Sequence, residues 1–473
     1  MLKKLFAHSF LYAIGPQVPK LANLLVLPII TAYLEPVDYG IYGTLIAYTG
    51  LLSGLRMLGF DVLLVNSFFK KNKWQAYWNR YLGGLYFYNI LFVGIYIVFL
   101  QIVMPKEVGN DRLLIITLII IPNTLFHVLN VFGGRYFQLA QKPQFVALVT
   151  AVVGSISVFI NLYTIAYLEL GYIGWFISTA IGGAITFVFY YSQLVKRINV
   201  KPILTRNKNF WRKSLRVALP TIPHNYSTYL LNSSDRMVMD QLGTPIGQIG
   251  RYNLAYIFGG YMELFGNAVG MAVGPYISAL HSKKTNEAEK QVQTLIFFLQ
   301  VCFITLCVLI SIWSKEIFYL LINNDELNQV YNISVIIIMG YAYRPLYWAS
   351  VNKLQFYEYT GKLWRISFVA GVINVVLNLI FIPIYGIMAA ALSTMLSLIY
   401  MGVAPYYIKE YKKLNNQKFY PIYWMISVVL LTGIVYSVID SNALFKGALS
   451  IIFITLFVIY FVRQKGNLNK IKV

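Results

Sequence analysis

A few charged side chains interrupt the long apolar stretches of this sequence, and they are the residues best placed to do chemistry. If those stretches cross a membrane, a charge at the centre of one costs about 2.5–3.5 kcal/mol. Each charged side chain should therefore face water, a partner or the edge of the bilayer. The cations are Lys20, Arg56, Arg135, Arg236 and Arg344, and the acids are Asp61, Asp235 and Glu263.

The depth of each cation within its stretch separates two groups. Lys20, Arg56 and Arg344 lie well inside, and Arg236 lies in the outer third of its stretch. Arginine can bind two phosphate oxygens at once and lysine acts as a point charge, so these four residues could bind a phosphate-bearing anion. Long side chains near helix ends reach the membrane surface, which favours a structural role for two residues there. These two are Arg135 and Asp61.

The two deeper arginines of the second half of the chain also have structural interpretations. Arg236 has acidic neighbours in Asp235 and Asp240 and could form an ion pair with either of them. Arg344 could instead bind backbone carbonyl groups nearby. Both alternatives remain open from the sequence alone.

Three titratable residues could take up a proton or bind a cation and so serve as coupling groups: Glu263, Asp235 and His224. Glu263 lies near the middle of its apolar stretch, and the unperturbed pKa of a histidine lies near physiological pH. The histidines are scattered without metal-ligand spacing, and no glycine-rich phosphate loop follows a strand. The sequence therefore predicts no metal and no cofactor.

The composition predicts the elements that must position these residues. Of the 473 residues 58% are hydrophobic and 12% are charged, whereas a soluble domain has about 25% charged residues. A membrane-spanning helix needs about 20 apolar residues, so the supply suffices for about 14 helices. We predict an all-α, polytopic integral membrane protein. The segments that matter below are 10–34, 217–242, 249–279 and 330–352, the first, seventh, eighth and tenth predicted helices.

The net charge of +22 comes mainly from lysine and arginine residues in the connecting segments, which indicates membrane orientation and not a nucleic-acid-binding surface. Lysine and arginine gather in alternate connecting segments, above all in 196–216. This pattern predicts that both termini and these segments are cytoplasmic. Anionic membrane lipids are their expected contact, and no nucleic acid is expected.

An internal duplication is visible in the order of glycine, asparagine and proline residues. Gly154 and Asn161 align with Gly371 and Asn378. After a two-residue gap, Gly171, Ser178 and Thr179 align with Gly386, Ser393 and Thr394. The proline pairs of the first and seventh predicted helices also align, and proline breaks at equivalent places predict hinges. We predict two six-helix bundles, 1–195 and 217–410, with a basic cytoplasmic linker at 196–216 and a C-terminal helix pair with a basic tail at 411–473. The hinge residues are Pro16, Pro19, Pro220 and Pro223.

Two local motifs carry a family resemblance. The stretch LPIITAYLEPVDYGIY at 27–42 resembles the first-helix motif of the Wzx-type polysaccharide flippases. The stretches SDR at 234–236 and GRYNLAY at 250–256 resemble the junction of the seventh and eighth helices of that family. The family belongs to a superfamily with the MATE exporters and the lipid II flippase MurJ, and the resemblance extends over essentially the whole chain.

The resemblance implies a V-shaped pair of bundles in the bacterial inner membrane and no enzymatic activity. Such a protein moves undecaprenyl-diphosphate-linked oligosaccharide, for O-antigen, capsule or exopolysaccharide, from the cytoplasmic to the outer leaflet by alternating access. A polysaccharide polymerase and a chain-length regulator are the implied protein partners. The substrate diphosphate would bind Lys20, Arg56, Arg344 and Arg236.

Two other functions remain as alternatives. A MATE-like, cation-coupled antiporter of drugs or other small molecules would need a dominant buried carboxylate, whereas cations outnumber acids within the predicted spans. A polysaccharide polymerase or ligase would need a sizeable extramembrane segment with carboxylates. The short outer loops argue against that activity.

Overall fold

The computed structural model describes residues 17–359, 361 and 363–469, and within these ranges the chain is helical without any strand. The predicted all-α class is thereby confirmed. The chain divides into two compact units, Met1–Tyr229 and Leu230–Val473. The division falls inside the helix Ile222–Asn232, and the bundle boundaries at 195 and 217 stay predictions.

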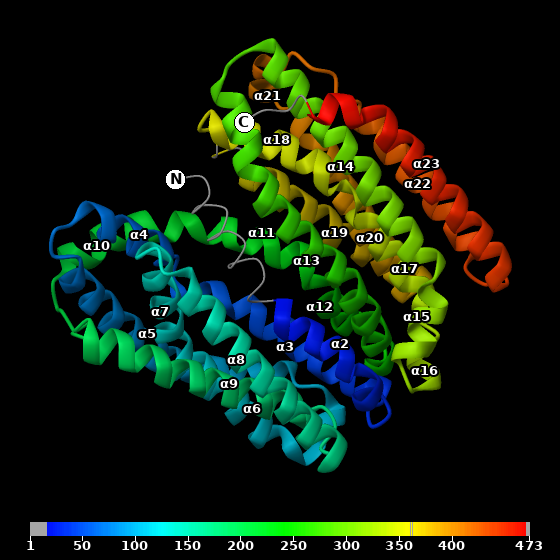
Figure 1. Cartoon of the computed structure of the whole chain (residues 1–473). Helices are drawn as coiled ribbons and strands as arrows, with labels where there is room; N and C mark the ends of the chain where they lie inside the picture. The colour runs from blue at the N-terminus through cyan, green and yellow to red at the C-terminus, as the bar shows by residue number, and fades with distance from the viewer. Residues whose placement is uncertain (1–16, 360, 362, 470–473) are drawn as a thin grey trace. The chain divides into compact units, whose positions relative to one another are not determined.

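Unit 1 contains the helices from the first predicted span to the start of the seventh (Figure 1). Short π-helical or 3₁₀ segments interrupt or extend several of them. The α-helices are α2 (Gln17–Thr31), α3 (Pro36–Met57), α4 (Asp61–Lys70), α5 (Trp74–Val103), α6 (Arg112–Ile121), α7 (His127–Leu139), α8 (Pro143–Asn161), α9 (Ile173–Tyr191), α10 (Lys208–Ala218) and α11 (Ile222–Asn232). The segments between or after them are η1 (Lys106–Asp111), η2 (Pro122–Phe126), η3 (Leu162–Tyr167), η4 (Ser192–Arg197) and η5 (Leu219–Thr221).

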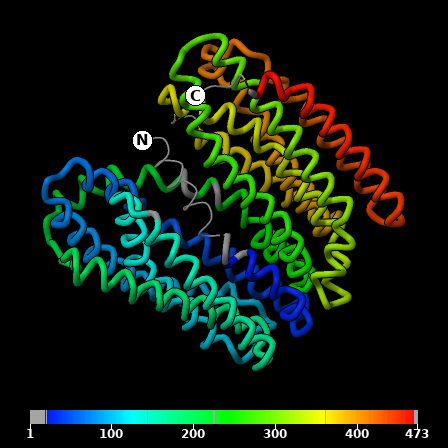
Figure 2. The backbone as a smooth tube through the Cα atoms, in the orientation of Figure 1, coloured from blue at the N-terminus to red at the C-terminus, as the bar shows by residue number. Residues whose placement is uncertain are grey.

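Unit 2 contains the remaining helices, and its C-terminal helix pair packs against α14 (Figure 2). Its α-helices are α12 (Ser234–Gln241), α13 (Ile246–Ser282), α14 (Asn286–Ile312), α15 (Ser314–Leu321), α16 (Asp325–Asn328), α17 (Tyr331–Gly340), α18 (Arg344–Phe356), α19 (Leu363–Tyr385), α20 (Ile387–Val403), α21 (Lys409–Leu414), α22 (Pro421–Val438) and α23 (Ala443–Asn469). Two 3₁₀ segments are η6 (Tyr341–Tyr343) and η8 (Ala404–Tyr407).

Among the described residues, 10 helices are long and apolar enough to cross a membrane. The figure of about 14 is not confirmed. Residues 1–16 lie outside the described part, which shortens the first span. Helix α13, which has 37 residues, and the predicted segments 217–242 and 330–352 are not among these 10 helices. The two predicted segments contain the 3₁₀ segments η5 and η6. These segments carry Arg236, Glu263 and Arg344, whereas Arg56 lies in a counted span, Pro36–Lys70.

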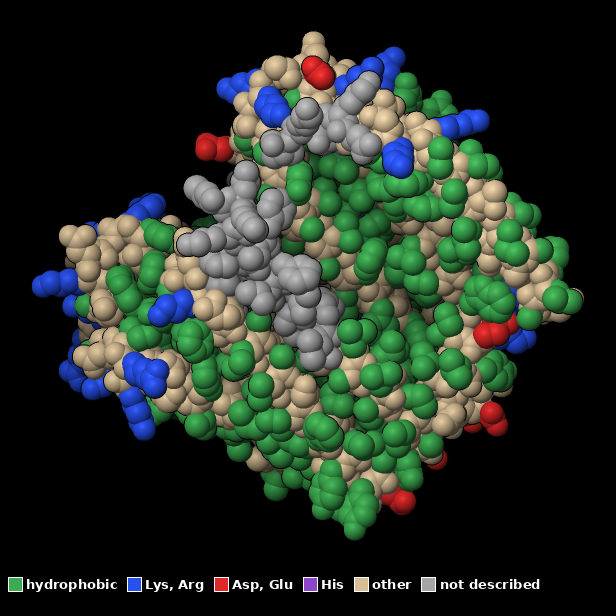
Figure 3. All heavy atoms as spheres, in the orientation of Figure 1, with side chains coloured by type: hydrophobic (Ala, Val, Ile, Leu, Met, Phe, Trp, Pro, Cys, Tyr) green, Lys and Arg blue, Asp and Glu red, His purple; other side chains and the backbone are tan. Residues whose placement is uncertain are grey.

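The outer surface of the helices is apolar where a membrane would surround it. On α5, Leu91, Ile95 and Ile102 are 62%, 63% and 77% exposed, and hydrophobic side chains cover much of the visible surface in Figure 3. A soluble protein rarely exposes so large an apolar area, so lipid is the solvent for this face. Lysine and arginine side chains gather at the end of unit 1 that α4 and α10 form.

The motif at 27–42 has a clear structural role. Pro36 occupies the first turn of α3, where its missing N–H is no loss. The Asp38 carboxylate accepts the backbone N–H of Glu35 at 2.8 Å and that of Tyr172 at 2.9 Å. One aspartate thus caps α3 and fixes the loop that precedes α9.

The internal duplication is visible in the packing of the two units. A Cβ at Gly154 on α8 would lie 2.1 Å from the ring of Pro19 on α2, and one at Gly371 on α19 would lie 2.6 Å from the Cβ of Leu230 on α11. Aligned glycines therefore allow equivalent close helix contacts in both units. The backbone agrees too, because the aligned glycines that precede α9 and α20 both have positive φ, 53° and 59°.

Candidate functional site

Arg56 is a buried cation in the last turn of α3, and only 2% of its surface is exposed. Its Nη1 donates a hydrogen bond to the Asn123 carbonyl at 2.6 Å, and its guanidinium lies 5.7 Å from the centre of the Tyr96 ring. Among the described residues it forms no ion pair with a carboxylate, and its Nε has no hydrogen-bond partner. A buried charge without a counter-ion is rare and marks a candidate site.

The local sequence explains why a carbonyl faces Arg56. Pro122 lacks the N–H that a regular helix would need there, and the chain forms the π-helical segment η2. A π segment leaves backbone carbonyls free to bind other groups. Asn123 offers its carbonyl to Arg56, and Leu125 offers its own to the Tyr86 hydroxyl at 3.0 Å.

In unit 2, Arg344 and Glu263 form an ion pair. Nη2 of Arg344 lies 3.0 Å from Oε1 of Glu263, and Nη1 donates to the Asn267 side chain at 2.8 Å. The Tyr341 hydroxyl donates to the other carboxylate oxygen at 3.2 Å. The side chains are 10% and 26% exposed for Arg344 and Glu263, so the acid is the more accessible partner. As with Arg56, the Arg344 Nε has no partner among the described residues.

Asp235 is fully buried at the start of α12 and joins four helices of unit 2. Its carboxylate accepts hydrogen bonds from Asn378 on α19 at 2.7 Å, from Thr394 on α20 at 3.1 Å and from the Tyr252 hydroxyl on α13. Asn378 and Thr394 are positions that the internal alignment singled out without assigning them to a site. Charged hydrogen bonds of this kind hold the four helices together.

Arg236, the next residue, is also held by protein groups. It donates to the Asn253 side chain at 3.0 Å and to the Asn232 carbonyl at 2.7 Å, and its guanidinium lies 4.1 Å from the centre of the Tyr256 ring. Only 6% of its surface is exposed. These contacts favour a structural role for Arg236 over a role in binding substrate.

The remaining predicted site residues are placed only in part. Pro16 and the side chains of Lys20 and His224 lie outside what the structure describes. Pro19 is buried against Gly154. Pro220 lies in η5, and Pro223 lies in the first turn of α11, the helix that follows. The helix is therefore interrupted at Pro220, and the hinge role of these prolines stays a prediction. The described residues contain no cluster of three or more potential metal ligands.

Sequence reasoning missed the neutral partners of these charges. Asn123 and Tyr96 at Arg56, and Asn267 and Tyr341 at Arg344, are polar residues within apolar helices. Their polarity inside a predicted span was the available indication. Their distance along the chain from the arginines concealed the pairing.

The fold defines the class of protein. Its helices match the lipid II flippase MurJ in an inward closed conformation with a TM-score of 0.70 at 14% identity, over 93% of this chain and 99% of that chain. A point mutant of the Vibrio cholerae MATE transporter VcmN matches at 0.55 and 13% identity, over 87% and 96%. A MOP superfamily transporter from Pyrococcus furiosus matches at 0.56 and 15% identity, over 91% and 96%. The chain thus has the polytopic fold of the MOP superfamily transporters.

The family follows from the sequence match. Residues 5–281 match the family described as polysaccharide biosynthesis protein, and residues 220–380 match the MatE family. The first match covers more than half of the chain, so this protein belongs to the polysaccharide biosynthesis protein family, and the predicted family resemblance is confirmed. No curated protein matches the sequence.

Proposed function

We propose that this protein is a flippase of undecaprenyl-diphosphate-linked oligosaccharide and moves it from the cytoplasmic to the outer leaflet of a bacterial inner membrane. Family membership supports the polysaccharide pathway. The similarity in fold to a lipid II flippase supports alternating access as the mode of transport. The protein uses no enzymatic step in this proposal.

The observation that carries the proposal is Arg56. It is a buried guanidinium with an unpartnered Nε and no carboxylate bound to it among the described residues, within an apolar unit. A diphosphate group supplies the oxygens that such a cation lacks, through charge-assisted hydrogen bonds. A neutral or cationic substrate would leave the charge of Arg56 uncompensated.

Arg344 offers a second diphosphate ligand that Glu263 controls. In the structure Glu263 occupies the position that a phosphate oxygen would take at the Arg344 Nη2. Substrate binding would displace Glu263, and the released carboxylate would then take up a proton or a cation. Glu263 is thereby the proposed coupling residue.

The other predicted residues take different parts in the proposal. Lys20 is a further cation for the diphosphate, and His224 is a further candidate for coupling. Arg236 and Asp235 support the helices of unit 2, since both are buried and hydrogen-bonded to neighbouring helices. The hinge prolines would permit the helix bending that alternating access needs.

A cation-coupled antiporter of small molecules is the second candidate function. Its specific support is the fully buried carboxylate of Asp235 together with the match to the MatE family. The three donors on that carboxylate leave little need for a cation. Arg56 is also unfavourable for a cationic substrate, so the flippase has the stronger support.

A deletion strain tests the proposal. Without the gene, surface polysaccharide should be lost and lipid-linked repeat units should accumulate on the cytoplasmic face, and the wild-type gene should restore both. Arg344→Gln and Lys20→Ala should fail to restore polysaccharide at equal membrane abundance. Arg365→Gln serves as the matched control, because this arginine is exposed and its guanidinium lies 5.9 Å from the neighbouring Trp364 ring. Normal polysaccharide in the deletion strain would overturn the flippase.

A further inference from the structure

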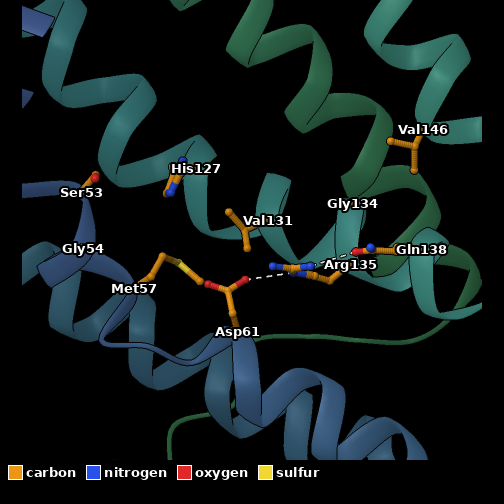
Figure 4. A pocket seen from close by; sticks show the side chains of 10 residues that line it. All are labelled: Ser53, Gly54, Met57, Asp61, His127, Val131, Gly134, Arg135, Gln138 and Val146. Atoms are coloured by element: carbon orange, nitrogen blue, oxygen red, sulfur yellow. Dashed lines mark hydrogen bonds and ion pairs between the residues drawn. The ribbon is translucent and has the colours of Figure 1, made fainter. Parts of the chain in front are cut away.

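A hollow of about 600 Å³ lies within unit 1, where the end of α3, the start of α4, helix α7 and helix α8 meet. Its size is within the range of about 300–1,000 Å³ that holds small ligands. Figure 4 shows Asp61 from α4 meeting Arg135 from α7 in this hollow, with Gln138 beside Arg135. Arg56 is not among the lining residues, so this hollow differs from the diphosphate position proposed above.

The polar groups of the hollow are prearranged yet accessible. Arg135 donates through Nε to Oδ1 of Asp61 at 3.0 Å and through Nη1 to the Gln138 side chain at 2.9 Å. The side chains of Arg135 and Asp61 remain 39% and 33% exposed. The second carboxylate oxygen, Oδ2 of Asp61, has no hydrogen-bond partner within the part of the chain that the structure describes. The hollow therefore offers Oδ2 of Asp61 as a fixed hydrogen-bond acceptor. The Nη2 group of Arg135 and the side-chain amide of Gln138 are hydrogen-bond donors next to it.

The balance of charge selects the kind of ligand. The lining contains one carboxylate and one guanidinium, already paired with each other. A diphosphate would meet repulsion from Asp61, and an organic cation would have to displace Arg135 from its counter-ion. A neutral ligand with several hydroxyl groups suffers neither penalty, because hydroxyls both donate to a carboxylate and accept from a guanidinium or an amide.

The apolar part of the lining fits the same ligand. Met57, Val131 and Val146 contribute hydrocarbon surface next to the polar groups. A sugar ring combines hydroxyl groups at its edge with C–H groups on its faces, so it matches a wall of this mixed character. Ser53 and His127 add further polar groups to the lining.

We propose that this hollow is a saccharide subsite that binds a neutral sugar residue of the lipid-linked oligosaccharide through Asp61, Arg135 and Gln138. The inference rests on the proposed flippase function and adds a second recognition site to it. The diphosphate supplies affinity for any substrate of this class, and the hollow distinguishes oligosaccharide from the bare lipid diphosphate.

Two variants separate the subsite from the fold. Asp61→Asn removes the carboxylate at nearly constant size. Gly134→Leu fills the hollow without changing a charge: a Cβ at Gly134 would have no neighbour closer than the Tyr190 hydroxyl at 4.0 Å. Gly94→Leu is the matched control, because a Cβ at this glycine on α5 meets no atom within 4 Å and the residue does not line the hollow.

The experiment measures the binding of two radiolabelled probes to the full chain in lipid nanodiscs. One probe is undecaprenyl diphosphate, and the other is the lipid-linked oligosaccharide extracted from the deletion strain. Asp61→Asn and Gly134→Leu should each weaken oligosaccharide binding about tenfold and leave undecaprenyl diphosphate binding unchanged, as expected for the loss of hydrogen bonds to a charged group. Gly94→Leu should bind both probes like the wild type.

Three other outcomes of this binding experiment would contradict the subsite. If both variants weaken the two probes equally, the hollow supports the fold or the diphosphate and does not bind sugar. If neither variant changes oligosaccharide binding, the subsite is wrong while the flippase function stands. If the wild type binds neither probe, the proposed function fails and the subsite fails with it.

Discussion

At the scale of single residues, the two buried arginines differ in what compensates their charge. Arg344 has Glu263 as a counter-ion, whereas Arg56 has a carbonyl and an aromatic ring. Carbonyl dipoles and ring faces stabilise a cation less than a carboxylate does at the same depth. Arg56 should therefore bind an anion more tightly than Arg344 does.

The first prediction concerns this difference. Arg56→Gln keeps the hydrogen bond to the Asn123 carbonyl within reach and removes the charge, so transport should fall at least about tenfold, a loss of about 1.4 kcal/mol or more in substrate binding. Membrane abundance should not fall, because an uncompensated buried charge is removed. Transport is measured by complementation of the deletion strain and abundance by immunoblotting. Full activity of Arg56→Gln would remove this residue from substrate binding.

The second prediction concerns an exposed ion pair in unit 2 between Lys315 on α15 and Asp440, which lies between α22 and α23. Their charged atoms lie 2.9 Å apart, and the side chains are 34% and 64% exposed. The hydrogen bond from Lys315, with a second from Tyr331, lowers the pKa of Asp440. The same bond raises the pKa of Lys315. Such an exposed pair contributes at most about 1 kcal/mol.

The sign of the pH dependence follows from these directions. Asp440 stabilises the fold above the ordinary pKa of an aspartate, about 3.9, and this contribution is lost as the pH falls through the lowered pKa. Lys315 contributes below about 10.4, and its contribution is lost as the pH rises through the raised pKa. The thermal unfolding midpoint of Asp440→Asn should thus lie slightly below that of the wild type by a constant amount between about pH 5 and 9. A difference that grows on acidification would contradict the assignment.

The sequence could predict which charged residues lie deep in the helices, but not which groups bind them. Depth in an apolar stretch identified Arg56, Glu263 and Arg344 correctly as buried or partly buried groups. The ion pair joins residues 81 positions apart, and the carbonyl that Arg56 binds is 67 positions away. Local periodicity carries no information about such contacts, because they depend on how whole helices pack.

At the scale of elements, composition and loop charge predicted the helices well where they are continuous. Two of the predicted helices contain 3₁₀ segments that composition and loop charge did not predict. Pro220 introduces η5, and the chain between α17 and α18 forms the 3₁₀ segment η6 directly before Arg344. A window of average hydropathy smooths over such breaks, so the predicted seventh and tenth helices appeared whole.

The third prediction tests the close helix contact that the duplication preserves. Gly371→Ala would place a Cβ 2.6 Å from the Leu230 Cβ, so α19 and α11 must separate or distort at a cost of about 1–3 kcal/mol. The midpoint of thermal unfolding in detergent should fall accordingly. Gly433→Ala is the matched control, and it should raise the unfolding midpoint instead of lowering it. Its Cβ on α22 meets no atom within 4 Å, and replacing a helical glycine by alanine stabilises by about 0.5–1 kcal/mol.

The two glycine variants must differ for the packing argument to stand. Equal midpoints for Gly371→Ala and Gly433→Ala would mean that the contact at Gly371 has room to adjust, and the duplicated glycine would then need another explanation. The equivalent change in unit 1, Gly154→Ala, should repeat the result because its Cβ would lie 2.1 Å from Pro19.

At the scale of the whole molecule, the net charge of +22 is a statement about orientation. The lysines and arginines near α4 and in the segment 196–216, which includes most of α10, lie at one end of unit 1. The positive-inside rule predicts a cytoplasmic position for this end. Asp61 and Gln138, which line the hollow, lie nine residues before Lys70 and four residues before Lys142.

The last prediction is therefore the orientation of these loops, tested by cysteine labelling in a background in which Cys302 and Cys307 are alanine. A membrane-impermeant maleimide should label Lys106→Cys in intact spheroplasts, whereas Lys201→Cys and Lys413→Cys should be labelled only in inverted vesicles; all three lysines are exposed. Labelling of Lys201→Cys in intact spheroplasts would contradict the orientation. It would also place the hollow near the outer face, away from the leaflet in which lipid-linked sugar is proposed to enter. The saccharide subsite therefore requires the predicted orientation. The positively charged end of unit 1 must face the side of the membrane from which the oligosaccharide enters.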